Sequence, residues 1–332
     1  MKIFITGGAG YCGSRLVPQL LEMGHDVTVY DACFFGSDGL DLNNTNLRLI
    51  VGDIRDLDLL KQSIMGHDIF INLACISNDA SFVLNEKLST SINLDAFKPM
   101  VLAAKEQGIK RFIYASSSSV YGVSEALEVT EDHELIPLTL YNKFKGECEP
   151  LLLEEADEDF TCVVFRPATV CGWSPRQRLD VSVNILTNLA VNKGEITVFG
   201  GTQRRPNIHI QDYIDVVKLL MTAPKHKIQK EIFNVGNENA TINEIALIVK
   251  SVVEKNFPEL GEIKIHRTES DDNRSYHINS NKIWNVLGFR ASRTIEDAVN
   301  ELCKAFKNGD LPNSLTDAKY FNVKTLVSKK IQ

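Results

Sequence analysis

The stretch that decides the fold is KIFITGGAGYCG, residues 2–13. It begins as an apolar strand and leads into a helix predicted at residues 14–22. Between them, three glycines stand at G-x-x-G-x-x-G spacing. Such a loop turns tightly, and its backbone and the first N–H groups of the helix can approach a pyrophosphate. The pattern predicts a dinucleotide-binding loop made of Gly7, Gly10, Tyr11, Cys12 and Gly13.

An acid at the end of the next strand indicates which dinucleotide binds. Asp31 closes a strand predicted at residues 26–30, about twenty residues beyond the loop, where a ribose-binding carboxylate is expected. A carboxylate accepts hydrogen bonds from the adenosine 2′-hydroxyl and repels a 2′-phosphate. NAD is therefore favoured over NADP as the cofactor. The alternative is that Asp31 has a structural role only and caps a turn.

Short apolar strands alternate with helices through the first half of the chain. Further strands are predicted at residues 47–51, 68–73, 111–115 and 163–165, and helices at 90–107 and 141–155. Strands that are apolar on both faces and separated by helices indicate a parallel sheet covered on both sides. The expected fold class is α/β, a doubly wound parallel sheet with a smaller C-terminal α/β substrate domain. We expect a cofactor domain at 1–170, joined by a returning strand at 231–235, a mainly substrate-binding domain at 171–310, and a polar surface tail at 311–332.

Composition argues against several classes of protein. The 332 residues are 44% hydrophobic, and the net charge is −7, so a nucleic-acid partner is not expected. No apolar run is long enough for a membrane span, and no signal peptide is expected before the first strand. Seven cysteines without a C-x-x-C pair indicate free thiols in a reducing, cytoplasmic setting. The seven histidines lack metal-ligand spacing, so no metal is expected.

Two segments carry side chains suited to proton transfer. Tyr141 and Lys145 stand four apart, on one face of a predicted helix. A phenol with a neighbouring ammonium can exchange a proton with a substrate hydroxyl. The run SSSSVYG at residues 116–122 closes the preceding strand and can supply a hydroxyl that orients the reacting oxygen.

These motifs, in this order, resemble the extended short-chain dehydrogenase/reductase family, and more narrowly its NAD-dependent epimerase/dehydratase group. The resemblance covers roughly residues 1–305 and implies a Rossmann-type fold and action on a nucleotide-diphosphate sugar. It assigns Ser117 as the catalytic serine, Tyr141 as the acid/base and Lys145 as its partner and a ribose contact. Further cofactor contacts implied by the resemblance are Asp53, Ile54, Leu73, Ala74, Cys75, Asn93 and Pro167.

The second half supports the same resemblance. Arg205, shortly before NIHIQD at 207–212, and Arg274 resemble the two arginines with which the family binds the substrate pyrophosphate, a role that suits guanidinium groups. Either could equally be a surface arginine. Further candidate substrate contacts are Ser118, Asn184, Arg176 and Arg178.

The resemblance leaves the reaction open. Related 4,6-dehydratases usually carry an Asp-Glu pair where this chain has Ser118 and Ser119, so dehydration is disfavoured. A 4-epimerase working through a 4-keto intermediate is favoured. The alternative is a C4 dehydrogenase or reductase, for example on a GDP-linked sugar or heptose. A catalytically inactive, cofactor-sensing protein is least favoured, because Ser117, Tyr141 and Lys145 are all retained.

The resemblance also implies a homodimer and a pathway. Family members commonly pair two helices from each subunit, and the corresponding helices are those predicted at 90–107 and 141–155. Polysaccharide or antibiotic-sugar biosynthesis is the implied setting. The nucleotide base and the sugar stay open, because base contacts come from loops without a readable pattern.

Overall fold

The computed structural model describes residues 1–77, 79–124, 126, 128–269 and 275–329. One large sheet organises the chain, and all its strands are parallel. Its strand order is β10-β6-β5-β4-β1-β2-β3. The strands are β1 (Lys2–Thr6), β2 (Asp26–Asp31), β3 (Leu47–Val51), β4 (Ile69–Asn72), β5 (Arg111–Ala115), β6 (Thr161–Pro167) and β10 (Glu231–Val235). The predicted fold class, a Rossmann-type doubly wound α/β sheet, is confirmed.

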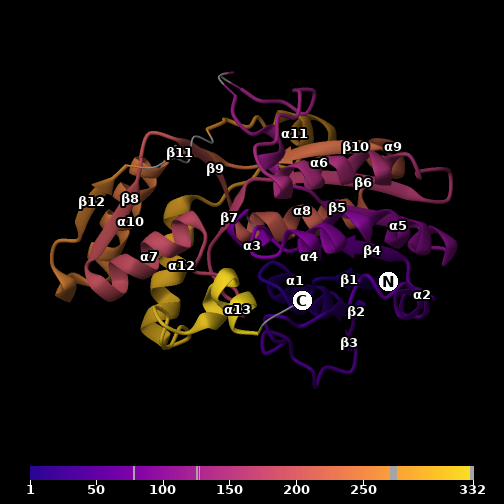
Figure 1. Ribbon diagram of the computed structural model, residues 1–332, viewed down its shortest axis with the longest axis horizontal. Helices are drawn as coiled ribbons and strands as arrows, with labels where there is room; N and C mark the ends of the chain where they lie inside the picture. Colours follow the sequence, from indigo (N-terminus) through magenta and orange to yellow (C-terminus); the bar gives the residue numbers. More distant parts are fainter. Residues whose placement is uncertain (78, 125, 127, 270–274, 330–332) are drawn as a thin grey trace.

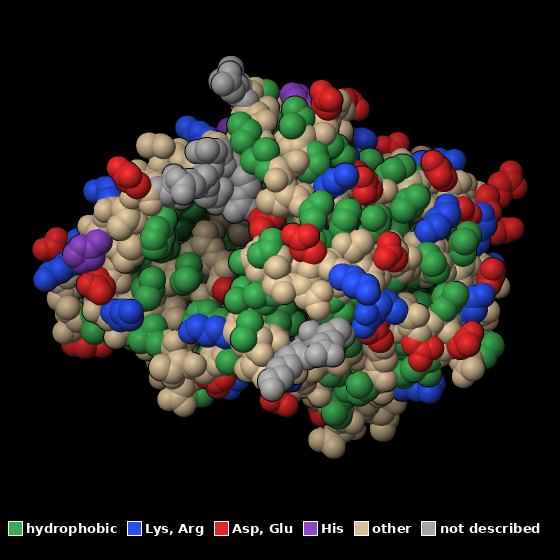
Figure 2. Space-filling model, in the orientation of Figure 1, with side chains coloured by type: hydrophobic (Ala, Val, Ile, Leu, Met, Phe, Trp, Pro, Cys, Tyr) green, Lys and Arg blue, Asp and Glu red, His purple; other side chains and the backbone are tan. Residues whose placement is uncertain are grey.

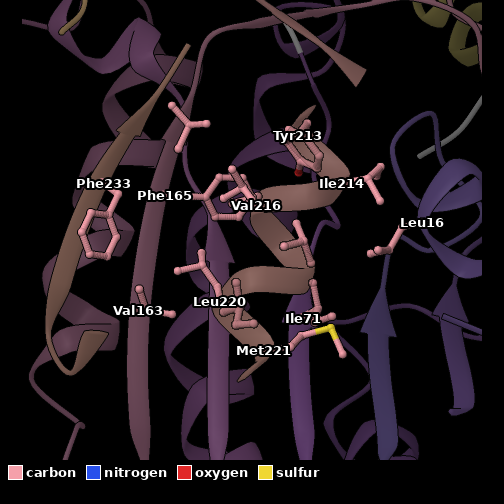
Figure 3. Close-up of a cluster of buried hydrophobic side chains, with 14 of the residues drawn as sticks. Leu16, Ile71, Val163, Phe165, Tyr213, Ile214, Val216, Leu220, Met221 and Phe233 are labelled. Carbon is pink, nitrogen blue, oxygen red and sulfur yellow. The ribbon is translucent and has the colours of Figure 1, made fainter. Parts of the chain in front are cut away.

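Helices cover both faces of this sheet (Figure 1). On β1, Ile3 and Ile5 pack into one buried cluster and Phe4 into another, as the two-residue period of a strand requires. The Ile3 side is covered by α1 (Gly13–Glu22) and α8 (Ile210–Thr222). In Figure 3, side chains of α8 such as Tyr213 and Leu220 lie over Phe165 and neighbouring strand residues. The Phe4 side is covered by α2 (Leu57–Ile64), α5 (Phe97–Glu106) and α6 (Leu140–Leu153).

A second group of strands and helices lies beside the large sheet, at the left of Figure 1. A three-stranded sheet has the order β11-β9-β7, and β12 pairs with β8. These strands are β7 (Thr169–Cys171), β8 (Glu195–Phe199), β9 (Arg204–His209), β11 (Glu238–Thr241) and β12 (Lys264–Thr268). Three helices form a third buried cluster with them: α7 (Ser182–Lys193), α10 (Ile242–Asn256) and α12 (Ile295–Asn308). Short helices complete the chain: α3 (Asp79–Phe82), α4 (Glu86–Thr90), α9 (Lys225–Ile228), α11 (Asn281–Leu287) and α13 (Asn322–Ser328).

Two local expectations differ from the structure. The helix expected at 90–107 is interrupted by a π-helical turn at Ser91–Asp95, between α4 and α5. In that turn, the Asn93 side chain bonds to both the N–H and the carbonyl of Ile76 instead of to its own helix. The tail beyond Asp310 is more than a polar surface segment, because Leu311, Tyr320 and Leu326 are buried.

In Figure 2, acidic and basic side chains are interspersed over the visible face. All seven cysteines are free thiols. Within the described residues, no helix combines the length and apolarity needed to cross a membrane, and no group of three His, Cys, Asp or Glu side chains could hold a metal ion.

Candidate active site

A cavity lies at the carboxyl ends of the sheet strands, beside the switch point where β1 separates β4 from β2. Ligands of doubly wound sheets bind at such a point. The cavity brings together most of the residues singled out from the sequence. Its lining includes Gly7, Gly10, Tyr11, Cys12, Gly13, Asp31, Asp53, Ile54, Leu73, Ala74, Cys75, Ser117, Ser118, Tyr141, Lys145, Pro167, Arg176 and Arg178.

The glycine loop requires its glycines for close packing. Gly7 has a φ of +75°, and a Cβ there would lie 2.6 Å from the backbone N of Ala74. A Cβ on Gly13 would lie 2.4 Å from the carbonyl oxygen of Gly8. Side chains at positions 7 and 13 would therefore block the tight path from β1 into α1, and their absence leaves the first turn of the helix open to the cavity.

Asp31 is held in place by backbone donors. Its carboxylate accepts hydrogen bonds from the N–H of Ala9 at 3.0 Å and of Cys33 at 2.8 Å. Burial raises the pKa of Asp31, and these two bonds oppose the rise. Since a carboxylate has about four lone-pair positions, Asp31 keeps acceptors for a ribose diol. The loop and this acid fit the adenosine half of NAD.

Asp53 and Ile54 line the same end of the cavity. The Asp53 carboxylate pairs with Arg55 at 2.6 Å. Burial would raise the pKa of Asp53, but the hydrogen bonds from Arg55 hold it below its usual value. The backbone carbonyl of Asp53 accepts a hydrogen bond from the Tyr30 hydroxyl at 2.8 Å, which fixes this segment against β2.

Tyr141 and Lys145 both face the cavity from α6. The Lys145 ammonium donates to the carbonyl of Ala115 at 2.7 Å. Burial raises the pKa of Tyr141 well above its usual value, and nearby Cys75 and Asp79 raise it further. The ammonium was expected to favour the phenolate, yet burial dominates in this structure. Positive charge opposes this rise: Arg178 lowers the pKa of Tyr141, and a cation bound in the cavity would lower it further.

A chain of hydroxyls orients Ser117. The Ser119 hydroxyl donates to the Asn142 side-chain oxygen at 2.6 Å, and the Ser117 and Ser119 oxygens lie 2.7 Å apart. Because the single Ser119 proton is used on Asn142, Ser117 is the donor to Ser119. The Ser117 oxygen also accepts a hydrogen bond from the Ser119 N–H at 3.2 Å, so two contacts fix its position. Asn142 follows Tyr141 on α6, so one helix sets both groups. Ser118 lies apart, with its oxygen 3.4 Å from the Tyr276 hydroxyl.

Four predicted site residues are not in the cavity lining. Asn93 supports the backbone of Ile76 from behind. Asn184 is fully buried and bonds to Gly172, to the Tyr11 hydroxyl and to the Arg178 carbonyl, so it positions Tyr11 and does not line the cavity. Arg205 lies on β9 and donates to the Arg204 carbonyl. Arg274 lies outside the described residues.

Arg176 and Arg178 both line the cavity, and Arg178 acts electrostatically on Tyr141 as well as on Cys12. The Arg176 guanidinium stacks over the Phe35 ring, 4.2 Å from its centre, and burial lowers the pKa of Arg176 to about 9. Burial raises the pKa of Cys12 to about 12, and both arginines oppose that rise, so both act on the glycine loop. From the sequence, Arg176 and Arg178 were predicted to contact the substrate.

The sequence reading missed several residues of the lining, among them Ser77, Asp79, Tyr276 and Asn322. Asp79 begins α3, and its carboxylate accepts a hydrogen bond from Thr139, the N-cap of α6. One signal could have found Asp79: it follows β4, and residues after the carboxyl ends of parallel strands line the site. Asn322 carried no such signal.

A doubly wound sheet whose cavity joins a glycine loop, a ribose-binding acid and a Ser/Tyr/Lys set defines an extended short-chain dehydrogenase/reductase. The model of the NAD dependent epimerase/dehydratase family matches residues 3–236, and the chain belongs to that family. NAD is its cofactor.

Two curated relatives match nearly the whole chain. The low-salt glycan biosynthesis protein Agl12 of Haloferax volcanii is 26% identical over 320 residues, which cover 93% of this chain and 99% of the relative. UDP-glucose 4-epimerase of Lactobacillus helveticus is 25% identical over 329 residues, covering 93% and 98%. Among solved structures, MoeE5 in complex with UDP-glucose and NAD is 25% identical, with a TM-score of 0.79 and coverage of 93% and 99%.

Proposed function

We propose that this protein is an NAD-dependent nucleotide-sugar epimerase that acts through a 4-keto intermediate. The observation that carries the proposal is the meeting of Ser117, Tyr141 and Lys145 at the cofactor cavity, with serine at both positions after Ser117. The substrate class is supported by the relatives named for UDP-glucose and by the MoeE5 complex with UDP-glucose.

Ser117, Tyr141 and Lys145 have different roles in the proposed reaction. When substrate binds, the Ser117 hydroxyl turns from Ser119 and donates a hydrogen bond to the C4 oxygen, which leaves the C4 hydroxyl proton directed at Tyr141. Tyr141 takes the hydroxyl proton as the C4 ketone forms, and returns it when the ketone is reduced. Lys145, fixed by the Ala115 carbonyl, adds positive charge that favours the tyrosinate. When bound, NAD supplies the reversible two-electron oxidation at C4. Reduction of the opposite face of the ketone yields the epimer.

The cavity offers little support for dehydration. Elimination of water across C5 and C6 needs a base and an acid placed together. Positions 118 and 119 carry hydroxyls, and Ser119 is already bonded to Asn142. Among the described lining residues, Asp79 is the carboxylate that acts electrostatically on Tyr141, and it is bonded to Thr139. A single carboxylate in this position favours recognition of a sugar hydroxyl over elimination.

Net oxidation or reduction at C4 is the alternative proposal. The SPRQRLD segment at 174–180 resembles enzymes that oxidise GDP-linked heptose at C4. Such an enzyme releases its ketone, so each turnover leaves NADH behind. Epimerisation regenerates NAD within each cycle.

A substrate panel separates these reactions. The protein as isolated, without added NAD, would be incubated with UDP-, dTDP-, GDP- and CDP-linked hexoses and heptoses. The proposal predicts conversion of one member to its C4 epimer, seen by proton NMR, without lasting NADH absorbance. Turnover that requires added NAD, or accumulation of a 4-keto product, would assign a dehydrogenase. A 4-keto-6-deoxy product would assign a dehydratase.

We also propose that two copies of the chain pair through α5 and α6. Leu102 on α5 and Leu140 on α6 are large apolar side chains that are more than one-third exposed. Light scattering after gel filtration tests this proposal: the dimer mass is expected for the wild type, and a Leu102→Glu variant should shift it towards the monomer. A wild-type monomer at all concentrations would contradict the pairing.

The division of labour along the chain stays a proposal as well. Residues 1–170 with β10 would bind the cofactor, and residues 171–310 would mainly bind the sugar nucleotide. The pairing of β10 with β6 supports the first assignment.

A further inference from the structure

The C-terminal segment returns to the cofactor cavity from the far end of the chain. We call residues 311–328 the C-terminal strap. Leu311 and Tyr320 anchor it in a buried cluster with Leu179 and Leu302. Leu326, on α13, packs into the core cluster under the large sheet, which Phe34 and Phe35 also contact. Figure 1 shows α13 between the two groups of sheets. The strap therefore lies beside the loop that follows β2, where Asp31 stands.

Asn322 connects the strap to two other segments. Its side-chain oxygen accepts a hydrogen bond from Arg176 at 2.6 Å, and its side-chain nitrogen donates to Ser77 at 3.0 Å. Its backbone N–H donates to the Asp180 carboxylate at 2.8 Å. Asn322 is 2% exposed and lines the cavity. One residue thus fastens together the loop after β4, the segment before α7 and the strap.

The arginines held by this junction keep unused donors. Arg176 Nε and Arg178 Nη2 are buried and have no hydrogen-bond partner among the described residues. Arg178 pairs with Asp180, at 2.8 Å, and the two guanidinium groups repel each other. Buried donors without partners are costly, so two of them beside a cavity indicate an anionic ligand. The Arg176 backbone N–H donates to the Ser14 side chain, in the first turn of α1, at 3.0 Å, which places this cluster beside the glycine loop, where the NAD pyrophosphate binds.

We propose that the C-terminal strap, through Asn322, holds Arg176 and Arg178 over the NAD pyrophosphate and keeps the cofactor on the protein between turnovers. The inference goes beyond the proposed function, since it concerns NAD alone and can be tested without any sugar. Asn322 is a positioning residue: it acts on the cofactor through Arg176. A strap that only completed the core would stabilise the NAD-free and NAD-bound protein equally.

The test measures NAD release from the holoprotein. The wild type and the Asn322→Ala variant would be loaded with labelled NAD and chased with excess unlabelled NAD, and the label that remains would be followed. Removing the contact with Arg176 should speed release about tenfold, the effect of one hydrogen bond to a charged group. Ser328→Ala, on the same helix but exposed, is the matched control and should release NAD at the wild-type rate.

A second readout separates cofactor binding from general stability. The rise in Tm on adding NAD to the NAD-free protein should be smaller for Asn322→Ala than for the wild type, in addition to any fall in Tm that the NAD-free variant shows. Release at the wild-type rate would overturn the proposal. So would an equal fall in Tm with and without NAD. If Asn322→Ala does not fold, Arg176→Gln decides by the same two measurements, with the same results expected.

Discussion

The two ends of the cavity are lined by different kinds of chemical group. At the adenosine end, backbone N–H groups hold the Asp31 carboxylate, and Arg176 is held by an asparagine from the C-terminal strap. At the catalytic end, short hydroxyls pass hydrogen bonds from Ser117 through Ser119 to Asn142. Fixed charges and backbone groups suit NAD, which stays bound between turnovers. Hydroxyl groups suit the sugar nucleotide, which binds and dissociates in each turnover. Each change below should affect one end and spare the other.

The largest effect is expected at Tyr141. Tyr141→Phe removes the group that exchanges the C4 hydroxyl proton, and general acid–base catalysis of this kind contributes about 10² to 10⁴ in rate. We expect kcat to fall by that factor, with NAD content unchanged. Steady-state kinetics and NAD extraction on the same sample provide the check. If the variant lost NAD to the same extent as activity, the claim that the two ends of the cavity act independently would be contradicted.

The support beneath the catalytic end should be the next most sensitive. Arg166 pairs with Glu149 at 2.6 Å, both almost fully buried, and Glu149 also accepts from Ser116, at the start of the serine run. Arg166→Met leaves a buried carboxylate without its partner, which should lower the free energy of unfolding by about 3–5 kcal/mol. Urea unfolding measures this loss.

Exposed Arg48 on β3 supplies the matched control. Arg48→Met should change the free energy of unfolding by no more than about 0.5 kcal/mol. Similar losses in the two variants would mean that the buried Arg166–Glu149 pair stabilises the fold no more than an exposed arginine does.

At the adenosine end, Asp31→Ala should weaken NAD binding. The variant loses charged hydrogen bonds to the ribose diol, worth about 1.5–3 kcal/mol, or roughly 10- to 100-fold in Kd. With saturating NAD, kcat should stay near that of the wild type. Titration calorimetry on NAD-free protein measures the Kd, with exposed Asp38→Ala as the control. Unchanged affinity would show that Asp31 only caps its turn.

The smallest effect is expected at Ser119. Ser119→Ala breaks the link from Ser117 to Asn142, so the Ser117 hydroxyl loses its orientation, and kcat should fall about tenfold, the loss of roughly one hydrogen bond. Ser119→Thr keeps the hydroxyl and should recover most of the rate. An equally slow Thr variant would indicate that packing at this position matters more than the hydrogen bond. NAD release should not change in either variant.

The sequence predicted the cofactor end well because its residues are close together along the chain. The glycine loop and Asp31 lie on consecutive elements, so strand and helix periodicity places them. Tyr141 and Lys145 share a helix face, which the four-residue spacing already indicates. The interruption at Ser91–Asp95 was missed because Asn93 bonds to Ile76, a tertiary contact that outweighs local helix propensity.

The strap could not be predicted, because nothing local ties Asn322 to Arg176, far away in the sequence. Its polar composition indicated a surface segment, yet the apolar side chains of Leu311, Tyr320 and Leu326 are buried, and so is the side chain of Asn322. Arg176 and Arg178 were found by their type, but their side of the cavity depends on that tertiary junction.

The central claim is that oxidation and reduction at C4 occur within one binding event. The most direct test uses the converted nucleotide sugar from the panel, carrying deuterium at C4, with the protein as isolated. We predict that the C4 epimer keeps its deuterium at C4, even when unlabelled substrate is present in equal amount and unlabelled NADH is added. Loss of deuterium from C4, or its appearance in free NADH, would contradict an epimerase and indicate net redox chemistry.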